Sequence, residues 1–201
     1  MQKVLYIKAN IKPEGESRSF RVSDSFIEEY KKNNPQDEII TLDLYKEGIN
    51  FLQGEDLQTV FGPKTEESKK HPILKYAYQF AEADKYVISL PMWNLSFPAI
   101  FKAYIDYVSV TGITFKYTAE GPVGLCKDKK ALFVSARGGQ YVEGKNAELE
   151  MGERYVRAIL EFFGITDVQS LTIENLDVMG ADVEGTVNQA IAEATNIAKE
   201  F

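Results

Sequence analysis

Three short segments of the sequence carry side chains suited to binding a flat ligand that has a phosphate group. The first, Ser17-Arg18-Ser19, offers two hydroxyls and a guanidinium at the start of a predicted helix. A helix N-terminus adds free N–H groups and the positive end of the helix dipole, which favour an anion. The segment has neither the glycines of a dinucleotide fingerprint nor the lysine of a Walker loop. On its own it favours a simpler interpretation, in which a serine only caps the helix.

The second and third segments predict the surface against which the flat part of the ligand lies. Residues 91–96, Pro-Met-Trp-Asn-Leu-Ser, place large apolar side chains where a polar turn is expected, so they indicate a wall with backbone amides at its edge. The alternative is a buried turn capped by Ser96. Residues 135–140, Ser-Ala-Arg-Gly-Gly-Gln, contain paired glycines, which allow a close approach of the backbone but also occur in ordinary turns. Together the segments predict a phosphate pocket beside a flat hydrogen-bonding slot.

Apolar runs and helical periodicity predict the elements that position these segments. The expected strands cover 4–7, 38–43, 85–90, 130–135 and 168–173, and the expected helices cover 20–33, 96–108, 149–163 and 183–201. Pro98 falls in the first turn of its helix, where proline is tolerated, and Gly164 is a typical helix terminator. Each of the three segments follows a strand, so all three share one edge of the sheet if the strands run parallel.

The alternation of strands and helices predicts the fold class, an α/β three-layer sandwich with a doubly wound, five-stranded parallel sheet. The strands are mostly apolar on both faces, as in a sheet that helices cover on each side. Five strand–helix units use about 150 residues. The surplus falls near 48–67 and 111–129, two segments rich in turn formers and aromatic residues. We find no repeat or linker, so we expect residues 1–201 to form a single domain, with ligands at the carboxyl ends of the strands.

Composition and charge exclude several classes of protein. Hydrophobic residues make up 44% of the 201 residues and charged residues 26%, which excludes disordered and fibrous chains. A net charge of −7 disfavours nucleic acids and anionic membrane surfaces as partners. No apolar run approaches the ~20 residues of a membrane span, and the first apolar run is too short for a signal peptide. The single cysteine, Cys126, cannot form an intrachain disulfide, so we expect a cytoplasmic protein.

Other reactive side chains do not form a recognisable site. His71 has no cysteine or carboxylate ligands around it, so we interpret it as a surface histidine and expect no metal. Cys126 has no neighbouring base or second cysteine, which disfavours a nucleophilic or redox role. The acidic stretch 143–153 is typical of a solvated loop and helix surface.

The chain resembles the FMN-dependent NADH-azoreductases and NADH:quinone oxidoreductases, a branch of the flavodoxin-like proteins, over almost its whole length. The motifs that carry the resemblance are Lys3-Val4-Leu5, Pro91-Met92-Trp93-Asn94, Tyr104-Ile105-Asp106, residues 111–117 with 121–125, Arg137-Gly138-Gly139 and residues 162–165. The family often has Tyr in place of Trp93, and its better-known members have Ser in place of Asn10 and Ala136. A side-chain hydrogen bond is therefore lost or replaced at each of the last two positions.

The resemblance implies a strand order of 2-1-3-4-5, a noncovalently bound FMN and a homodimer with its active sites at the interface. The cofactor contacts that it implies are Ser17, Arg18, Ser19, Met92, Trp93, Asn94, Leu95, Ala136, Arg137, Gly138 and Gly139. One phosphate segment without a second glycine-rich loop favours FMN over FAD. The many aromatic residues between 97 and 107 also indicate an interface, because one sheet face is unlikely to cover them all.

The function that follows is the transfer of two electrons from NADH to quinones, with reductive cleavage of aromatic azo compounds. We expect a ping-pong mechanism, because both substrates use the same face of the flavin in turn. We expect no catalytic protein side chain, because the flavin carries the chemistry. The expected substrate pocket consists of Trp93 and Asn94, with Phe115 and Tyr117 closing over it from the second surplus segment.

Two alternatives are a flavodoxin-like FMN electron carrier without small-molecule turnover and a non-enzymatic nucleotide-binding protein. The long aromatic surplus segments favour the enzyme, since a carrier leaves its flavin edge bare.

Overall fold

A computed structural model describes residues 1–13 and 15–201, and its centre is a five-stranded parallel sheet. The strands are β1 (Lys3–Lys8), β2 (Glu38–Asp43), β3 (Lys85–Pro91), β6 (Lys130–Ala136) and β7 (Asp167–Ile173). Their order is β2-β1-β3-β6-β7, and every neighbouring pair is parallel. The predicted fold class and the predicted 2-1-3-4-5 order are therefore confirmed.

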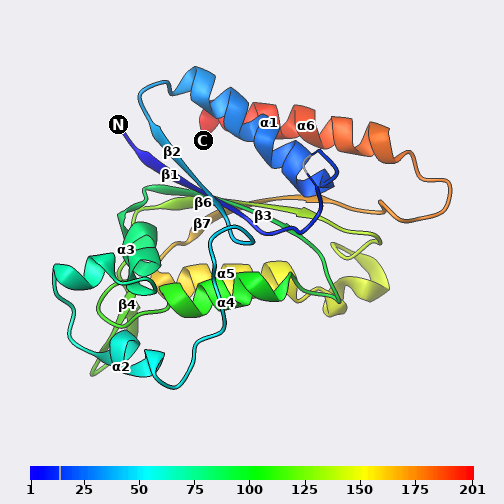
Figure 1. Ribbon diagram of the computed structural model, residues 1–201. Coiled ribbons are helices and arrows are strands. Elements are labelled where there is room, and N and C mark those ends of the chain that lie inside the picture. The colour runs from blue at the N-terminus through cyan, green and yellow to red at the C-terminus, as the bar shows by residue number, and fades with distance from the viewer. Residues whose placement is uncertain (14) are drawn as a thin grey trace.

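Helices cover both faces of this sheet (Figure 1). On one face α1 (Arg18–Asn33) and α6 (Val183–Glu200) lie side by side, and on the other face lie α3 (Leu74–Glu82), α4 (Ala99–Val108) and α5 (Gly152–Phe163). Each layer encloses its own apolar core. The central strand β3 is buried at every position because both of its faces meet helices, which explains why its sequence is a continuous apolar run.

Two helices begin a few residues later than their periodicity predicts. In α4, Pro98 takes the N-cap position, so the helix begins at Ala99 and the preceding residues stay in a turn. Before α5, residues Gly144–Leu149 form the 3-10 segment η2. The Glu150 carboxylate then accepts hydrogen bonds from the backbone N–H groups of Gly152 and Glu153, which caps α5. At the other end Gly164 has a φ of +97° and terminates α5, as predicted.

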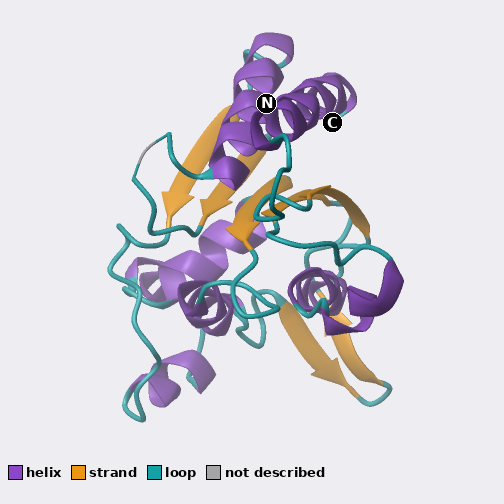
Figure 2. Cartoon of the chain, turned by 90° about the vertical axis from the view of Figure 1, so that its right-hand side faces the viewer, coloured by secondary structure: helices purple, strands orange, loops and turns teal. Residues whose placement is uncertain are grey.

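The second surplus segment forms an antiparallel hairpin, β4 (Phe115–Thr118) and β5 (Gly121–Gly124), which stands apart from the main sheet (Figure 2). The hairpin packs on the end of α5, where a Cβ on Gly124 would lie 2.2 Å from the Phe163 carbonyl carbon. Only a residue without a side chain allows this approach. Since the hairpin follows α4 and precedes β6, it lies at the amino ends of the strands.

The first surplus segment contains the short helix α2 (Asp56–Phe61), and the 3-10 turn η1 (Glu67–Lys70) follows it before the chain enters α3. Across residues 1–13 and 15–201, no helix has both the length and the apolar character needed to cross a membrane.

Candidate functional site

The turn after β3 holds Trp93 at the carboxyl edge of the sheet. Trp93 and Ser96 exchange two backbone hydrogen bonds, of 3.0 and 2.9 Å, which close a tight two-residue turn. Its central residues, Asn94 and Leu95, have φ values of +49° and +70°. A leucine in the left-handed region is strained, and such strain gathers at functional sites. The turn leaves the side chains of Trp93 and Leu95 each 37% exposed.

The segment 17–19 separates into a capping residue and a residue that faces a cavity. Ser17 is fully buried, and its hydroxyl accepts the Phe20 N–H as the N-cap of α1. The same hydroxyl accepts a 2.9 Å hydrogen bond from the side-chain amide of Asn10 and lies 3.1 Å from the Ser19 hydroxyl. Asn10 thus replaces the usual serine with a side chain that ties the loop after β1 to the helix. Ser19 and Asn10, but not Ser17, line the adjoining cavity.

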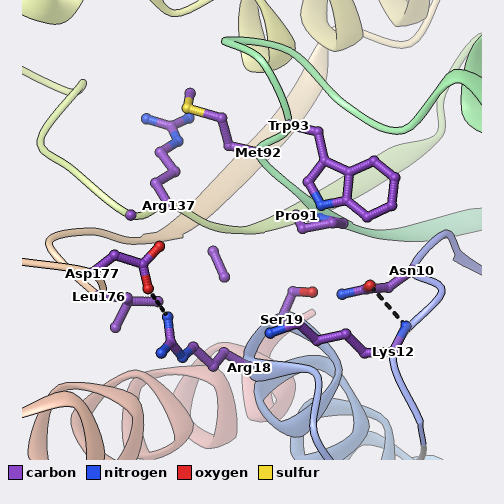
Figure 3. Close-up of a pocket in the computed structure, with 12 residues that line it drawn as sticks. Asn10, Lys12, Arg18, Ser19, Pro91, Met92, Trp93, Arg137, Leu176 and Asp177 are labelled. Carbon is purple, nitrogen blue, oxygen red and sulfur yellow. Dashed lines mark hydrogen bonds and ion pairs between the residues drawn. The ribbon is translucent and has the colours of Figure 1, made fainter.

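That cavity has a volume of about 190 Å³ and lies where β1, β3, β6 and β7 end (Figure 3). Its lining residues are Asn10, Lys12, Arg18, Ser19, Pro91, Met92, Trp93, Ala136, Arg137, Gly138, Leu176 and Asp177. In Figure 3 the cations Lys12 and Arg18 lie on the opposite side of the cavity from Met92 and Trp93. The arrangement is a small polar chamber with two positive charges at one end and an apolar wall at the other.

A second, larger cavity of about 580 Å³ adjoins the first at Trp93. Its lining is mostly apolar and comes from the turn after β3, from α4 and from the chain that follows β2: Tyr45, Ile49, Asn50, Phe51, Trp93, Asn94, Ser96, Phe97, Ala99, Ile100 and Ala103. The first surplus segment, rather than the second, therefore contributes to this cavity.

Phe115 and Tyr117 line neither of these two cavities. Phe115 is buried against Phe162 of α5, with ring centroids 4.6 Å apart, and Tyr117 is 69% exposed on the hairpin. The expectation that they close over the pocket of their own chain does not hold. The reason is topological: a segment between a helix and the next strand returns to the amino ends of the strands, whereas both cavities lie at the carboxyl ends.

Arg137 is directed at carboxylates. Its side chain is 1% exposed and forms ion pairs with Glu153 at 2.9 Å and with Glu150 and Glu174 at 3.4 Å. Its backbone N–H donates to Ile173 and its carbonyl accepts from Leu176. Only the guanidinium Nε has no partner within the described residues. The guanidinium fixes the loop after β6 rather than offering a free charge to a ligand.

The carboxylates around Arg137 hold the same loop in turn. Glu174 accepts the backbone N–H groups of Tyr141 and Val142, and Glu150 caps α5. Burial raises the pKa of Glu153. Hydrogen bonds from Ser170 and Arg157, together with the positive charges of Arg157 and Arg137, lower it by more than burial raises it, so the pKa lies below its ordinary value. The carboxylate is therefore ionised at neutral pH.

The glycine pair after Arg137 presents unoccupied backbone donors. Within residues 1–13 and 15–201, the N–H groups of Gly138 and Gly139 have no hydrogen-bond acceptor, while their carbonyls accept from Asp177 and Asn175. A Cβ on Gly138 would lie 2.5 Å from Asp177 Oδ2, so only glycine fits. Free amides beside a polar chamber suit the polar edge of a planar ligand.

Cys126 and His71 are not part of this arrangement. The Cys126 thiol is buried behind the hairpin, and burial raises its pKa to about 11, which leaves it protonated at neutral pH. His71 Nδ1 accepts the backbone N–H of Ile73 at the start of α3.

Comparisons with known proteins agree with this geometry. The family model for the flavodoxin-like fold matches residues 2–198. The chain is 68% identical to an FMN-dependent NADH:quinone oxidoreductase from Clostridium perfringens and 63% identical to one from Clostridium beijerinckii, over the full length of each chain.

Solved structures of similar fold include two azoreductases. The chain is 39% identical to an azoreductase from Bacillus anthracis, with a TM-score of 0.90 and full coverage of both chains. A second B. anthracis protein, an FMN-dependent NADH-azoreductase in complex with FMN, is 28% identical with a TM-score of 0.88, over 100% of this chain and 99% of that one.

Proposed function

Since the chain belongs to the family of proteins with the flavodoxin-like fold, we propose that it is an FMN-dependent oxidoreductase that transfers two electrons from NADH to quinones and to aromatic azo compounds. The names of its relatives, FMN-dependent NADH:quinone oxidoreductase and FMN-dependent NADH-azoreductase, support the cofactor, the electron donor and the two classes of acceptor. The structural observation that carries it is the pair of adjoining cavities, one small and cationic, the other large and apolar, with Trp93 between them.

The residues of the smaller cavity fit FMN. Lys12, Arg18 and the Ser19 hydroxyl, with the N-terminus of α1, would hold the phosphate. The free N–H groups of Gly138 and Gly139 would hold the polar edge of the ring system. Bound FMN would supply the two-electron chemistry, so no catalytic side chain is required of the protein.

The larger cavity gives the chain a place for a second planar molecule. Its apolar wall, which includes Trp93, Phe97, Ile100 and Phe51, offers flat surfaces for a nicotinamide, a quinone or an azo compound. An electron carrier requires no such cavity, because its redox partner is a protein that docks at the exposed edge of the flavin. The cavity therefore favours the enzyme over the carrier.

The visible absorbance spectrum of the purified protein tests this function. Protein as isolated should show the spectrum of oxidised flavin, and anaerobic NADH should bleach it within the time of one turnover. Addition of a quinone should restore it. Loss of absorbance only with a chemical reductant, and not with NADH, would contradict the proposal.

A homodimer and a cytoplasmic location belong to the same proposal. The aromatic residues Phe101, Tyr104 and Tyr107 of α4 are buried in their own chain, so they do not form the surface patch that the sequence indicated. Exposed apolar side chains of the first surplus segment support a dimer instead: Phe51, which lines the larger cavity, is 70% exposed, and Phe61 at the end of α2 is 74% exposed. Light scattering at micromolar concentration should give twice the mass of one chain. A fully active monomer would rule the dimer out.

A further inference from the structure

The cationic end of the smaller cavity contains a carboxylate, that of Asp177. It is the one acidic side chain among the residues that line this cavity, and its Oδ1 lies 2.8 Å from Arg18 Nη1 (Figure 3). The residue comes from the loop after β7, whose end shares the sheet edge with β1 and β6. A guanidinium that is paired with a carboxylate has less charge and fewer donors to offer to a phosphate.

Backbone hydrogen bonds fix the position of Asp177. Its N–H donates to the carbonyl of Gly138 at 2.9 Å, and the N–H of Leu176 donates to the carbonyl of Arg137 at 3.2 Å. The carboxylate lies directly over Gly138, since a Cβ there would be 2.5 Å from Oδ2. The negative charge thus lies beside Gly138 and Arg18, at the exposed rim of the cavity in which the phosphate of FMN is proposed to bind.

We propose that Asp177 competes with the phosphate of FMN for Arg18, and that FMN must displace its carboxylate from this guanidinium. A carboxylate and a phosphate are both preferred partners of a guanidinium, and two anions in one small chamber repel each other. Asp177 therefore weakens the binding of FMN and sets how strongly the site distinguishes a phosphorylated flavin from one without phosphate. This inference rests on the proposed function, because it takes the smaller cavity to be the phosphate site.

The neighbouring ion pair of α1 provides a matched control. Arg21 and Glu184 form a double hydrogen bond, at 2.9 and 2.8 Å, one turn further along the helix. Glu184 is exposed to the same degree as Asp177, with 68% and 70% of their side chains accessible, and it does not line the cavity. Neutralising Glu184 changes the net charge by the same amount and removes a bridge between α1 and the first turn of α6.

The test compares the dissociation constants of FMN and of riboflavin, measured by flavin fluorescence on flavin-free protein. The variants are Asp177→Asn, Glu184→Gln, Arg18→Gln and the double variant Arg18→Gln/Asp177→Asn. In Asp177→Asn, FMN should bind about threefold to tenfold more tightly while riboflavin changes less than about twofold. Glu184→Gln should leave both constants within about twofold. In the double variant the gain from Asp177→Asn should be smaller than in the single variant, because the carboxylate then has no Arg18 guanidinium to occupy and only the repulsion between the two anions remains.

The outcomes separate this inference from the proposed function. If Arg18→Gln weakens FMN and riboflavin equally, the smaller cavity is not the phosphate site and the proposed function loses its support there. If Arg18→Gln weakens FMN alone but Asp177→Asn leaves FMN binding unchanged or weakens it, the phosphate site stands and the role of Asp177 is wrong. Equal tightening by Glu184→Gln would also overturn it, because the effect would then come from net charge.

Discussion

At the scale of single residues, the structure divides roles that the sequence places together. Ser17 and Ser19 belong to one predicted phosphate segment, yet Ser17 is a buried N-cap and Ser19 faces the cavity. Both interpretations of the segment were available from the sequence, and each applies to one serine. Lys12 also lines the cavity, and its place in the loop after β1 could have predicted this, but it lies outside the predicted phosphate segment 17–19.

These different roles predict different effects for two alanine variants, one on stability and one on FMN binding. Ser17→Ala should lower the free energy of unfolding by about 1 kcal/mol, because it leaves the N-terminal amides of α1 and the Asn10 side chain without their acceptor. Ser19→Ala should cost less stability than Ser17→Ala, because the Ser19 hydroxyl caps no backbone N–H, and it should weaken FMN more than riboflavin. Urea unfolding and flavin titration measure the two effects. A common loss of stability in both variants would contradict the division.

Trp93 is predicted to act on the substrate more than on the cofactor. Its side chain lies between the two cavities. Trp93→Ala removes this side chain but keeps the turn, because the hydrogen bonds between residues 93 and 96 are formed by the backbone. Turnover should fall about tenfold, with an altered order of preference among quinones, because a flat stacking surface is lost. FMN affinity should change less than turnover. Trp93→Phe is the control and should retain most of the activity.

At the scale of elements, chain order and periodicity predict the sheet, whereas the contacts around the site depend on residues far apart in the sequence. The central strands could be predicted because they are short apolar runs, buried at every position in β3. The edge strands β2 and β7 are partly exposed and contain polar residues, but their apolar residues still indicate strands. The carboxylates of Arg137 could not, because Glu150, Glu153 and Glu174 lie 13, 16 and 37 positions away and belong to different elements. The same holds for Asp177, which joins the site only because β7 ends at the same edge as β6.

The loop after β6 is predicted to lose its anchor in acid. Because the pKa of Glu153 is lowered in the folded protein, its ionised form stabilises the fold above the pKa of an unfolded glutamate, and this contribution disappears as the pH falls through the folded value. Glu153→Gln should therefore cost about 1–3 kcal/mol near pH 7, and the difference from the wild type should shrink below about pH 4.

Urea unfolding across this pH range measures that difference. Glu143→Gln removes an exposed carboxylate of the same loop, which contacts Gln140 and not Arg137, and should change stability by less than about 0.5 kcal/mol at every pH. A constant difference for Glu153→Gln from neutral to acidic pH would show that the Arg137 contact does not depend on the charge of Glu153.

At the scale of the whole molecule, the two cavities set the order in which substrates bind. The apolar cavity shares Trp93 with the cationic cavity, and we expect NADH and the acceptor to use it in turn. Initial rates measured against the acceptor at several fixed NADH concentrations should therefore give parallel double-reciprocal lines, as expected when the first product leaves before the second substrate binds. NAD+ should compete with the acceptor and not with NADH, because NAD+ and the acceptor bind the same reduced form of the enzyme. Intersecting lines would mean that both substrates bind together, and the larger cavity would then hold only one of them.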